Sequence, residues 1–159
     1  MFKFLKKKEL ELLSPITGKM VEITEVPDPV FAEKMIGDGV AIEPTDGMVL
    51  APCQGKVVQV FPTNHAVGIE IERGIDLLIH VGIDTVEMQG DGFERLIQEG
   101  ERVSIGTPLL KMDIDKINSY GKHTITPVII TTMDKIQKLD IATGNVRAGK
   151  DVVMKVKIK

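Results

Sequence analysis

Two histidines in the middle of the sequence, His65 and His80, are the residues best suited to carry chemistry. Residues 66–71 and 75–81 are rich in alternating apolar side chains and are predicted to pair as a hairpin around the turn signal Glu72–Gly74. In this hairpin His65 lies opposite His80, so the two imidazoles are expected to be neighbours across the ladder. With an ordinary pKa of about 6.5, imidazole offers a neutral, nucleophilic nitrogen near pH 7.

A pair of histidines is well suited to carrying a phosphoryl group. One ring nitrogen can attack phosphorus, while the second imidazole donates a hydrogen bond to the charge on the transferring group. An apolar rim around the pair would exclude water and prevent hydrolysis of the phosphorylated ring. The sequence has no G-x-x-x-x-G-K-[ST] loop, so ATP is not expected to be the phosphoryl source.

Other chemistries remain open for the same two residues. Zinc could bind at His65 and His80, although two histidines supply only half of a tetrahedral shell. Asp84 or Glu70 could add ligands, but the sequence contains neither an H-E-x-x-H nor a Cys-x-x-Cys motif, so no metal is required. A glycine-flanked elbow serine is also missing, which argues against a Ser–His hydrolase. Each histidine could instead be an ordinary strand-edge residue.

Composition narrows the class of protein. The chain has 159 residues and a net charge of −3, because 23 acidic residues outnumber 20 basic ones. Nucleic-acid-binding domains are usually basic, so this balance argues against a nucleic-acid partner. Cys53 is the only cysteine, which fits a reducing compartment, and no apolar run approaches the roughly 18 to 20 residues of a membrane span. We therefore expect a cytoplasmic protein, and the sequence implies no cofactor.

A single domain is expected to span residues 13–159, since this length is typical of one hydrophobic core. Residues 1–12 begin with the basic stretch Met1–Lys8, which lacks the apolar core of a secretory signal. This segment is predicted to be a mobile basic tail. Its few apolar side chains could also make weak contact with an anionic membrane surface.

Apolar residues recur mostly at every second position, as in Val67–Ile71 and Val152–Lys159. This period places them on one face of a strand, and Gly- and Pro-rich turns separate the runs. The pattern predicts an all-β protein: an antiparallel β-sandwich or barrel-sandwich with a few short helices. These helices are predicted after the capping residue Asp28, in Gly92–Gly100 and in Asp115–Tyr120.

The sequence also repeats itself. Leu13–Ile23 resembles Leu50–Val60, 37 residues later, with Pro, Gly, Lys and the apolar positions coinciding. Gly100–Leu109 and Asn145–Val152 share a second pattern, Val-x-x-Gly-x-x-apolar. Two such coincidences predict a sheet built from an internally duplicated motif.

Several short segments with distinctive motifs follow one another along the chain. They are Phe31–Lys34, Gly37–Ile42, Ala51-Pro52, Thr63–Ala66, Leu77–Val86, Gly90–Phe93 and Thr126–Val128. Together they resemble the glucose-type enzyme IIA family of the bacterial phosphotransferase system. The resemblance runs from about Leu13 to Lys157, and the segment around His80 is its most specific part.

The resemblance implies roles for four residues. His80 would be phosphorylated on Nε2, with its Nδ1–H bonded to the backbone carbonyl of Gly82. His65 would hydrogen-bond the phosphoryl group, and Thr63 would orient His65. The phosphohistidine of HPr would be the donor, and the acceptor would be a cysteine on the IIB domain of a IIB/IIC sugar permease, with glucose favoured. Regulatory target proteins are implied as further partners.

The resemblance also implies a partner-binding surface around the histidines. Asp38 and Asp84 match acids of the family that flank the site and face basic residues on partners. Five residues match its apolar rim: Val40, Phe61, Val67, Leu78 and Val81. Aliphatic residues stand at Val67, Leu78 and Val81, where enteric relatives often have Phe.

A swinging-arm carrier of the biotinyl or lipoyl type is the main alternative. Gly100–Leu109 followed by Lys111 has the turn spacing of such domains, but Lys111 lacks their Met-Lys-Met hairpin. A zinc hydrolase that shares the duplicated β motif is disfavoured, because the sequence has no His-x-His pair. A purely regulatory binding module also fits.

Overall fold

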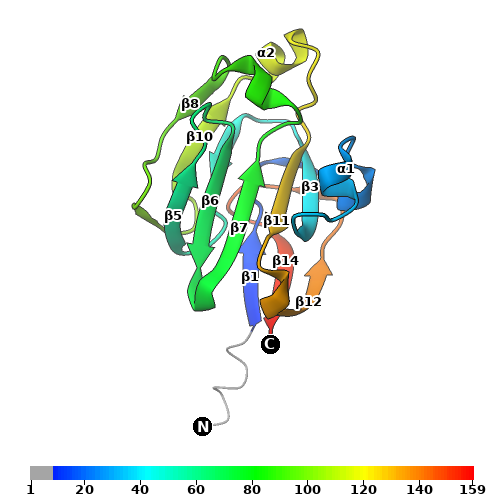
Figure 1. The fold of residues 1–159 in the computed structure, drawn as a ribbon, viewed down its shortest axis with the longest axis vertical. Helices are drawn as coiled ribbons and strands as arrows, with labels where there is room; N and C mark the ends of the chain where they lie inside the picture. Colours follow the sequence, from blue (N-terminus) through cyan, green and yellow to red (C-terminus); the bar gives the residue numbers. More distant parts are fainter. Residues whose placement is uncertain (1–8) are drawn as a thin grey trace.

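The computed structural model of the protein describes residues 9–159 and is built mainly from antiparallel β-strands (Figure 1). The largest sheet has eight strands in the order β13-β2-β3-β11-β7-β6-β5-β9. Their bounds, in that order, are Asn145–Val146, Gly18–Glu22, Asp38–Pro44, Thr126–Ile130, Ile75–His80, Ala66–Ile71, Gly55–Val60 and Arg102–Val103.

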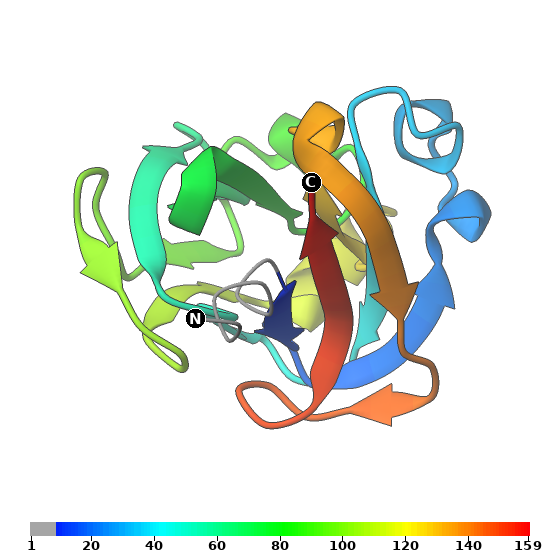
Figure 2. The same cartoon turned by 90° about the horizontal axis from the view of Figure 1, so that it is seen from below.

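Two three-stranded sheets complete the fold of the described residues. The first has the order β1-β14-β12 (Glu9–Leu13, Val152–Ile158, Ile136–Ile141), and the second has the order β4-β10-β8 (Met48–Leu50, Pro108–Met112, Phe93–Arg95). Figure 2 shows β14 between β1 and β12 at one end of the molecule. The two short helices are α1 (Pro29–Ala32) and α2 (Ile114–Ser119), and α2 lies at the opposite end (Figure 1). The predicted antiparallel β-sandwich class is therefore confirmed.

The sheets enclose a core of Val, Ile, Leu and Met side chains. Strand β7 shows how this core positions the candidate chemistry. Ile75, Leu77 and Ile79 are buried, whereas His80 at the end of the strand lies on the other, partly exposed face. A slip of one residue would turn the apolar set outward, so burial of the core fixes the face on which His80 lies.

The first internal repeat is visible as reciprocal hydrogen bonds. Leu13 N–H donates to the Pro52 carbonyl at 3.0 Å, and Leu50 N–H donates to the Pro15 carbonyl at 2.8 Å. Leu13 corresponds to Leu50 and Pro15 to Pro52, each 37 positions later, so the two bonds are equivalent under the repeat. The two copies of the repeat therefore face each other about a pseudo-twofold axis.

The second repeat follows the same symmetry. Gly149 N–H donates to the Ser14 carbonyl at 2.8 Å, and Gly106 N–H donates to the Ala51 carbonyl at 3.0 Å. Correspondingly, β13 pairs with β2, and β9 pairs with β5. The strand order of the large sheet is symmetric about the β11–β7 pair. This symmetry confirms the predicted duplicated motif.

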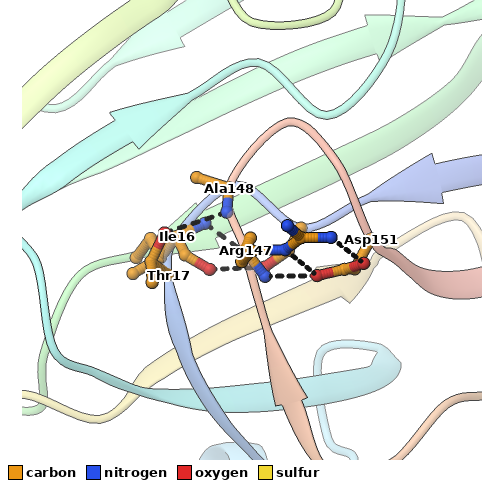
Figure 3. Close-up of polar contacts among 6 residues, drawn as sticks. Ile16, Thr17, Arg147, Ala148 and Asp151 are labelled. Carbon is orange, nitrogen blue, oxygen red and sulfur yellow. Dashed lines mark hydrogen bonds and ion pairs between the residues drawn. The ribbon is translucent and has the colours of Figure 1, made fainter.

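The turn at residues 147–151 packs on Leu13–Ile23, the first copy of the first repeat (Figure 3). Ala148 N–H donates to Thr17 Oγ1 at 3.0 Å. Within the turn, Arg147 N–H donates to Asp151 Oδ2 at 2.8 Å, and the guanidinium forms an ion pair with the same carboxylate. The bond from Ala148 to Thr17 joins the turn before β14 to the segment before β2, and the Arg147–Asp151 contacts close the turn itself.

Two of the three predicted helices are present. Asp28 caps α1 by accepting a hydrogen bond from Val30 N at 2.9 Å, and α2 coincides with the segment predicted at 115–120. The helix predicted over 92–100 is wrong, because Phe93–Arg95 forms β8 and pairs with β10. Pairing with a neighbouring strand overrides the helical spacing of its apolar residues.

The N-terminal boundary also differs from the prediction. Residues 9–12 were expected to belong to a mobile tail, but they form β1 with β14 as partner, and Leu12 is completely buried. The expected tail and membrane contact at residues 1–8 lie outside the described residues. Within residues 9–159, no helix has the length and apolar character to cross a membrane.

Gly18 offers a test of the packing between β2 and β3. A Cβ at this position would overlap the backbone carbonyl of Glu43, so Gly18→Ala requires the strands to separate. We expect Gly18→Ala to lower the free energy of unfolding by about 3 kcal/mol, measured by urea denaturation.

Gly68→Ala is the matched control, because the nearest atom to its added Cβ is 3.6 Å away, on Gln59. This control is expected to change the free energy of unfolding by less than about 1 kcal/mol. Equal effects of the two substitutions would contradict the predicted overlap at Gly18.

Candidate functional site

The two candidate histidines lie at one end of the β6–β7 hairpin. The pairing places Ala66, not His65, opposite His80, so the predicted register is wrong by one residue. The turn Glu72–Gly74 has three residues, and Ile71 pairs with Ile75 on either side of it. The pairing is therefore symmetric about Arg73, the middle residue of the turn. The rings of His65 and His80 nevertheless lie together, with centroids 5.0 Å apart and planes inclined at 81°.

His80 is held by a backbone carbonyl. Its Nδ1 lies 2.8 Å from the carbonyl oxygen of Gly82. A carbonyl can only accept a hydrogen bond, so Nδ1 of the neutral ring carries the proton and Nε2 has a free lone pair. Gly82 has a φ of 76°, and a Cβ there would lie 2.8 Å from the carbonyl oxygen of His123. Only glycine fits this turn without strain.

His65 is more deeply buried than His80, with 2% of its surface exposed. Its Nδ1 lies 2.5 Å from Thr63 Oγ1, and Asn64 between them adopts a left-handed φ of 60°. Burial, together with the nearby charge of His80, lowers the pKa of His65 to about 4. His65 is therefore neutral at pH 7.

Three phenylalanines surround the histidine pair. Phe31 of α1 lies 5.0 Å from His80 between ring centroids, while Phe61 and Phe93 lie 5.3 and 6.4 Å from His65. They are all the phenylalanines in residues 9–159. Their rings remove water from the imidazoles while leaving one side of His80 accessible. The roles of Phe31 and Phe93 in this cluster were missed in the sequence.

Two carboxylates act on His80. Burial lowers the pKa of its imidazole, whereas the hydrogen bond to Gly82 and the charges of Asp28 and Asp84 raise it. Asp84 is exposed in the loop after β7, and Asp28 caps the helix whose Phe31 packs against His80. The site is therefore an apolar pocket for the ring with negative charge beside it.

Asp28 is a second acid that acts on His80, besides the predicted Asp84. Asp38, which was predicted to flank the histidines and face partners, forms an ion pair with Lys34 at 3.5 Å, and its role toward partners stays a prediction. In the sequence, Asp28 precedes Pro29 and was predicted only as the cap of a helix. Its effect on His80 was not predicted.

The predicted apolar rim is divided between the core and the surface. Val40, Val67 and Val81 are at most 1% exposed, so they support the site from beneath and are not available to a partner. Phe61 and Leu78 are half-buried at the surface. The exposed apolar side chains next to the site are instead Val30 and Val86, at 39% and 52% exposure.

The zinc site considered at His65 and His80 stays a prediction. No group of three or more His, Cys, Asp or Glu side chains in residues 9–159 is arranged to hold an ion. His65 and His80 would provide only two ligands to zinc. The single cysteine lies elsewhere, half-buried, and burial followed by the charge of Glu72 raises the pKa of Cys53 to about 12. Its thiol is therefore not a nucleophile at pH 7.

Comparison with known proteins identifies the family. A sequence model of the phosphoenolpyruvate-dependent sugar phosphotransferase system, EIIA 1, matches residues 10–136. The chain belongs to this family. It is 47% identical over 134 residues to a PTS system glucose-specific EIIA component of Staphylococcus epidermidis, covering 84% of this chain and 81% of that one. It is 45% identical over 155 residues to the PTS system glucose-specific EIIA component of Bacillus anthracis, covering 97% of this chain and 94% of that one.

The fold agrees with the family. Glucose permease IIA from Mycoplasma capricolum superimposes with a TM-score of 0.85 and 35% sequence identity, covering 92% of this chain and 95% of that one. The chain is therefore an EIIA component of the sugar phosphotransferase system, with a phosphotransferase role as a phosphoryl carrier.

The low pKa of His65 predicts an acid-labile fold. Between the unfolded pKa of about 6.5 and the folded pKa of about 4, the unfolded state binds a proton at this residue and the folded state does not. The free energy of unfolding should therefore fall as the pH falls through this window, by about 3 kcal/mol in total from His65. Urea denaturation from pH 7 to pH 4 measures this loss.

His65→Gln is the control for this titration, because glutamine cannot be protonated there. Its free energy of unfolding should depend less steeply on pH between 6.5 and 4 than that of the wild type. Identical slopes in the two proteins would contradict the buried, neutral state of His65.

The assignment of Asp28 as the second acid can be tested by titration of His80. Asp28→Asn keeps an oxygen that can cap α1 but removes the charge, so we expect the pKa of His80 to fall in an NMR titration. Asp38→Asn removes a charge that is paired with Lys34 and should leave the pKa of His80 unchanged. A fall in the His80 pKa in Asp38→Asn but not in Asp28→Asn would contradict the influence assigned to Asp28.

Proposed function

We propose that the chain carries phosphoryl groups on Nε2 of His80. It would accept them from the phosphohistidine of HPr and deliver them to a cysteine on the IIB domain of a sugar permease. The observation that carries this proposal is the bond between His80 Nδ1 and the Gly82 carbonyl, which leaves Nε2 unprotonated beside a second imidazole. Glucose is the proposed sugar because the relatives described above are named glucose-specific.

The transfer needs only the residues of the site. The lone pair of His80 Nε2 attacks phosphorus in line with the nitrogen–phosphorus bond of the donor, which breaks and leaves its electron pair on the donor imidazole. Positive charge develops on the His80 ring, which keeps its proton on Nδ1. The Gly82 carbonyl and the carboxylates of Asp28 and Asp84 stabilise that charge. A cysteine thiolate of the permease then attacks the same phosphorus, and His80 Nε2 regains its lone pair.

His65 is proposed to bind the transferring phosphoryl group. If the Thr63 hydroxyl donates to His65 Nδ1, the proton of the neutral ring resides on Nε2 and is available to a phosphoryl oxygen. Its low pKa keeps the ring a neutral donor throughout the physiological pH range. A fixed donor of this kind stabilises charge in the transition state without reorganisation.

The surface around the site suits partners that are basic and apolar. Asp84 is exposed and negatively charged, and Val86 two residues further on is an exposed apolar side chain, as is Val30 beside Phe31 in α1. Such a face complements a partner with basic residues around an apolar patch. Regulatory proteins that use this face would sense whether His80 carries a phosphoryl group.

The geometry disfavours a swinging-arm carrier. The lysine of such a domain must stand at an exposed turn to move its cofactor, but Lys111 lies inside β10 and pairs with Met48 on one side and Glu94 on the other. Its backbone is therefore held within a sheet and is not at an exposed turn.

Labelling with phosphoenolpyruvate, enzyme I and HPr tests the proposal. The wild type should acquire an acid-labile, base-stable phosphate, and His80→Gln should lose it completely. His123→Gln is the matched control, because His123 is exposed and its ring is not part of the cluster. Label that survives His80→Gln, or disappears in His123→Gln, would refute the assignment.

His65→Gln tests the second imidazole. We expect phosphoryl transfer to slow about a hundredfold, the usual effect of removing one donor to a transition-state charge. Stopped-flow or quench-flow transfer rates measure this effect, and circular dichroism checks that the variant is folded. Unchanged transfer in a folded variant would remove His65 from the mechanism.

A further inference from the structure

The loop after β7 contains a buried threonine, Thr85, that contacts the backbone on which His80 depends. Thr85 is completely buried, and its Oγ1 donates to the Val81 carbonyl at 2.6 Å. Its methyl carbon Cγ2 packs against Gly82, 2.5 Å from the position that a Cβ on this glycine would occupy. The side chain therefore restrains two successive residues that follow His80.

The peptide between Gly82 and Ile83 is fixed at both ends. Its carbonyl accepts from His80 Nδ1 at 2.8 Å, and its N–H donates to the His123 carbonyl at 3.0 Å. Hydrogen bonds on the two sides of one peptide polarise each other and strengthen the pair. The Val81 N–H also donates to the His65 carbonyl at 2.7 Å, so the preceding residue is tied to the second histidine.

The hydroxyl of Thr85 completes this network. Val81 has its N–H bonded to His65 and its carbonyl bonded to Thr85, which leaves neither group free to rotate. The next carbonyl along the chain, that of Gly82, points toward Nδ1 of His80. Loss of the Thr85 hydroxyl would leave the Val81 carbonyl without this donor and allow both peptides to turn.

We propose that Thr85 is a positioning residue for the phosphoryl transfer at His80. It aims the Gly82 carbonyl at Nδ1 and so keeps the ring in the tautomer whose Nε2 can attack phosphorus. This inference rests on the proposed function of His80. Thr85 does not touch the phosphoryl group, and its effect is transmitted by the backbone of Val81 and Gly82.

The test combines a spectroscopic and a kinetic measurement on the full chain. In Thr85→Val, which keeps the shape but lacks the hydroxyl, we expect imidazole ¹⁵N NMR to show an increased fraction of His80 with its proton on Nε2. We also expect phosphoryl transfer from phospho-HPr to slow about ten- to a hundredfold, because misplacement of a reacting group costs rate. Thr85→Ser keeps the hydroxyl and should restore both the tautomer and most of the rate.

Ser14→Ala is the matched control, because Ser14 is also completely buried and its hydroxyl donates to a backbone carbonyl, that of Ile16. It is expected to leave the His80 tautomer and the transfer rate unchanged. If Thr85→Val does not fold, Thr85→Ala removes the hydroxyl without placing a second methyl group against the Val81 carbonyl.

Two outcomes would overturn the inference. One is a Thr85 variant without the hydroxyl that keeps both the wild-type tautomer and the wild-type rate. The other is Thr85→Ser behaving like Thr85→Val, because the hydroxyl that the serine retains would then not be enough to position the Gly82 carbonyl. The tautomer is measured on the unphosphorylated protein and does not depend on the proposed function. A wild type that cannot be phosphorylated would refute that function but leave the NMR result to decide the link between Thr85 and His80.

Discussion

The hydrogen bond from His80 Nδ1 to the Gly82 carbonyl is the interaction on which the site depends. It decides which ring nitrogen is protonated, and therefore which one has the lone pair that can attack phosphorus. Such a bond requires a backbone that turns back on itself directly after a strand, and the positive φ of Gly82 provides this turn. The sheet fixes where β7 ends, and the loop held by Thr85 and His123 fixes the carbonyl. The rest of the fold holds the end of β7 and this loop in a fixed position relative to each other.

Burial acts alike on the two imidazoles, whereas the nearby charges distinguish them. Burial lowers the pKa of both, which keeps them neutral near pH 7. Asp28 and Asp84 raise the pKa of His80 alone, so this ring can accept the positive charge that phosphorylation places on it, whereas His65 remains a neutral donor. Two residues of the same type thus obtain different roles from their surroundings. The pseudo-twofold symmetry of the fold is broken here, because the described chain has no second histidine pair around β11, the counterpart of β7.

Features encoded by local patterns could be predicted from the sequence. Alternating apolar residues and the repeated Pro-x-x-Gly steps at Pro15 and Pro52 led to the antiparallel fold and its duplication, both of which are confirmed. Features that depend on long-range contacts could not be predicted. Phe93 forms a strand because β10 lies beside it, and Asp28 acts on His80 only because α1 folds back onto the end of β7. Val67 and Val81 were predicted to belong to the apolar rim but are buried in this chain, because a strand pattern does not say which apolar residues the other sheets cover.

The central claim, that phosphoryl transfer uses the Nε2 atom of His80, is tested most directly by NMR of the phosphorylated protein labelled with ¹⁵N in its histidines. Coupling between phosphorus and nitrogen identifies the atom that carries the phosphoryl group. The site geometry predicts phosphorus bonded to Nε2 of His80, with the proton still on Nδ1 and hydrogen-bonded to Gly82. Phosphorus on Nδ1 of His80, or on either nitrogen of His65, would contradict the account.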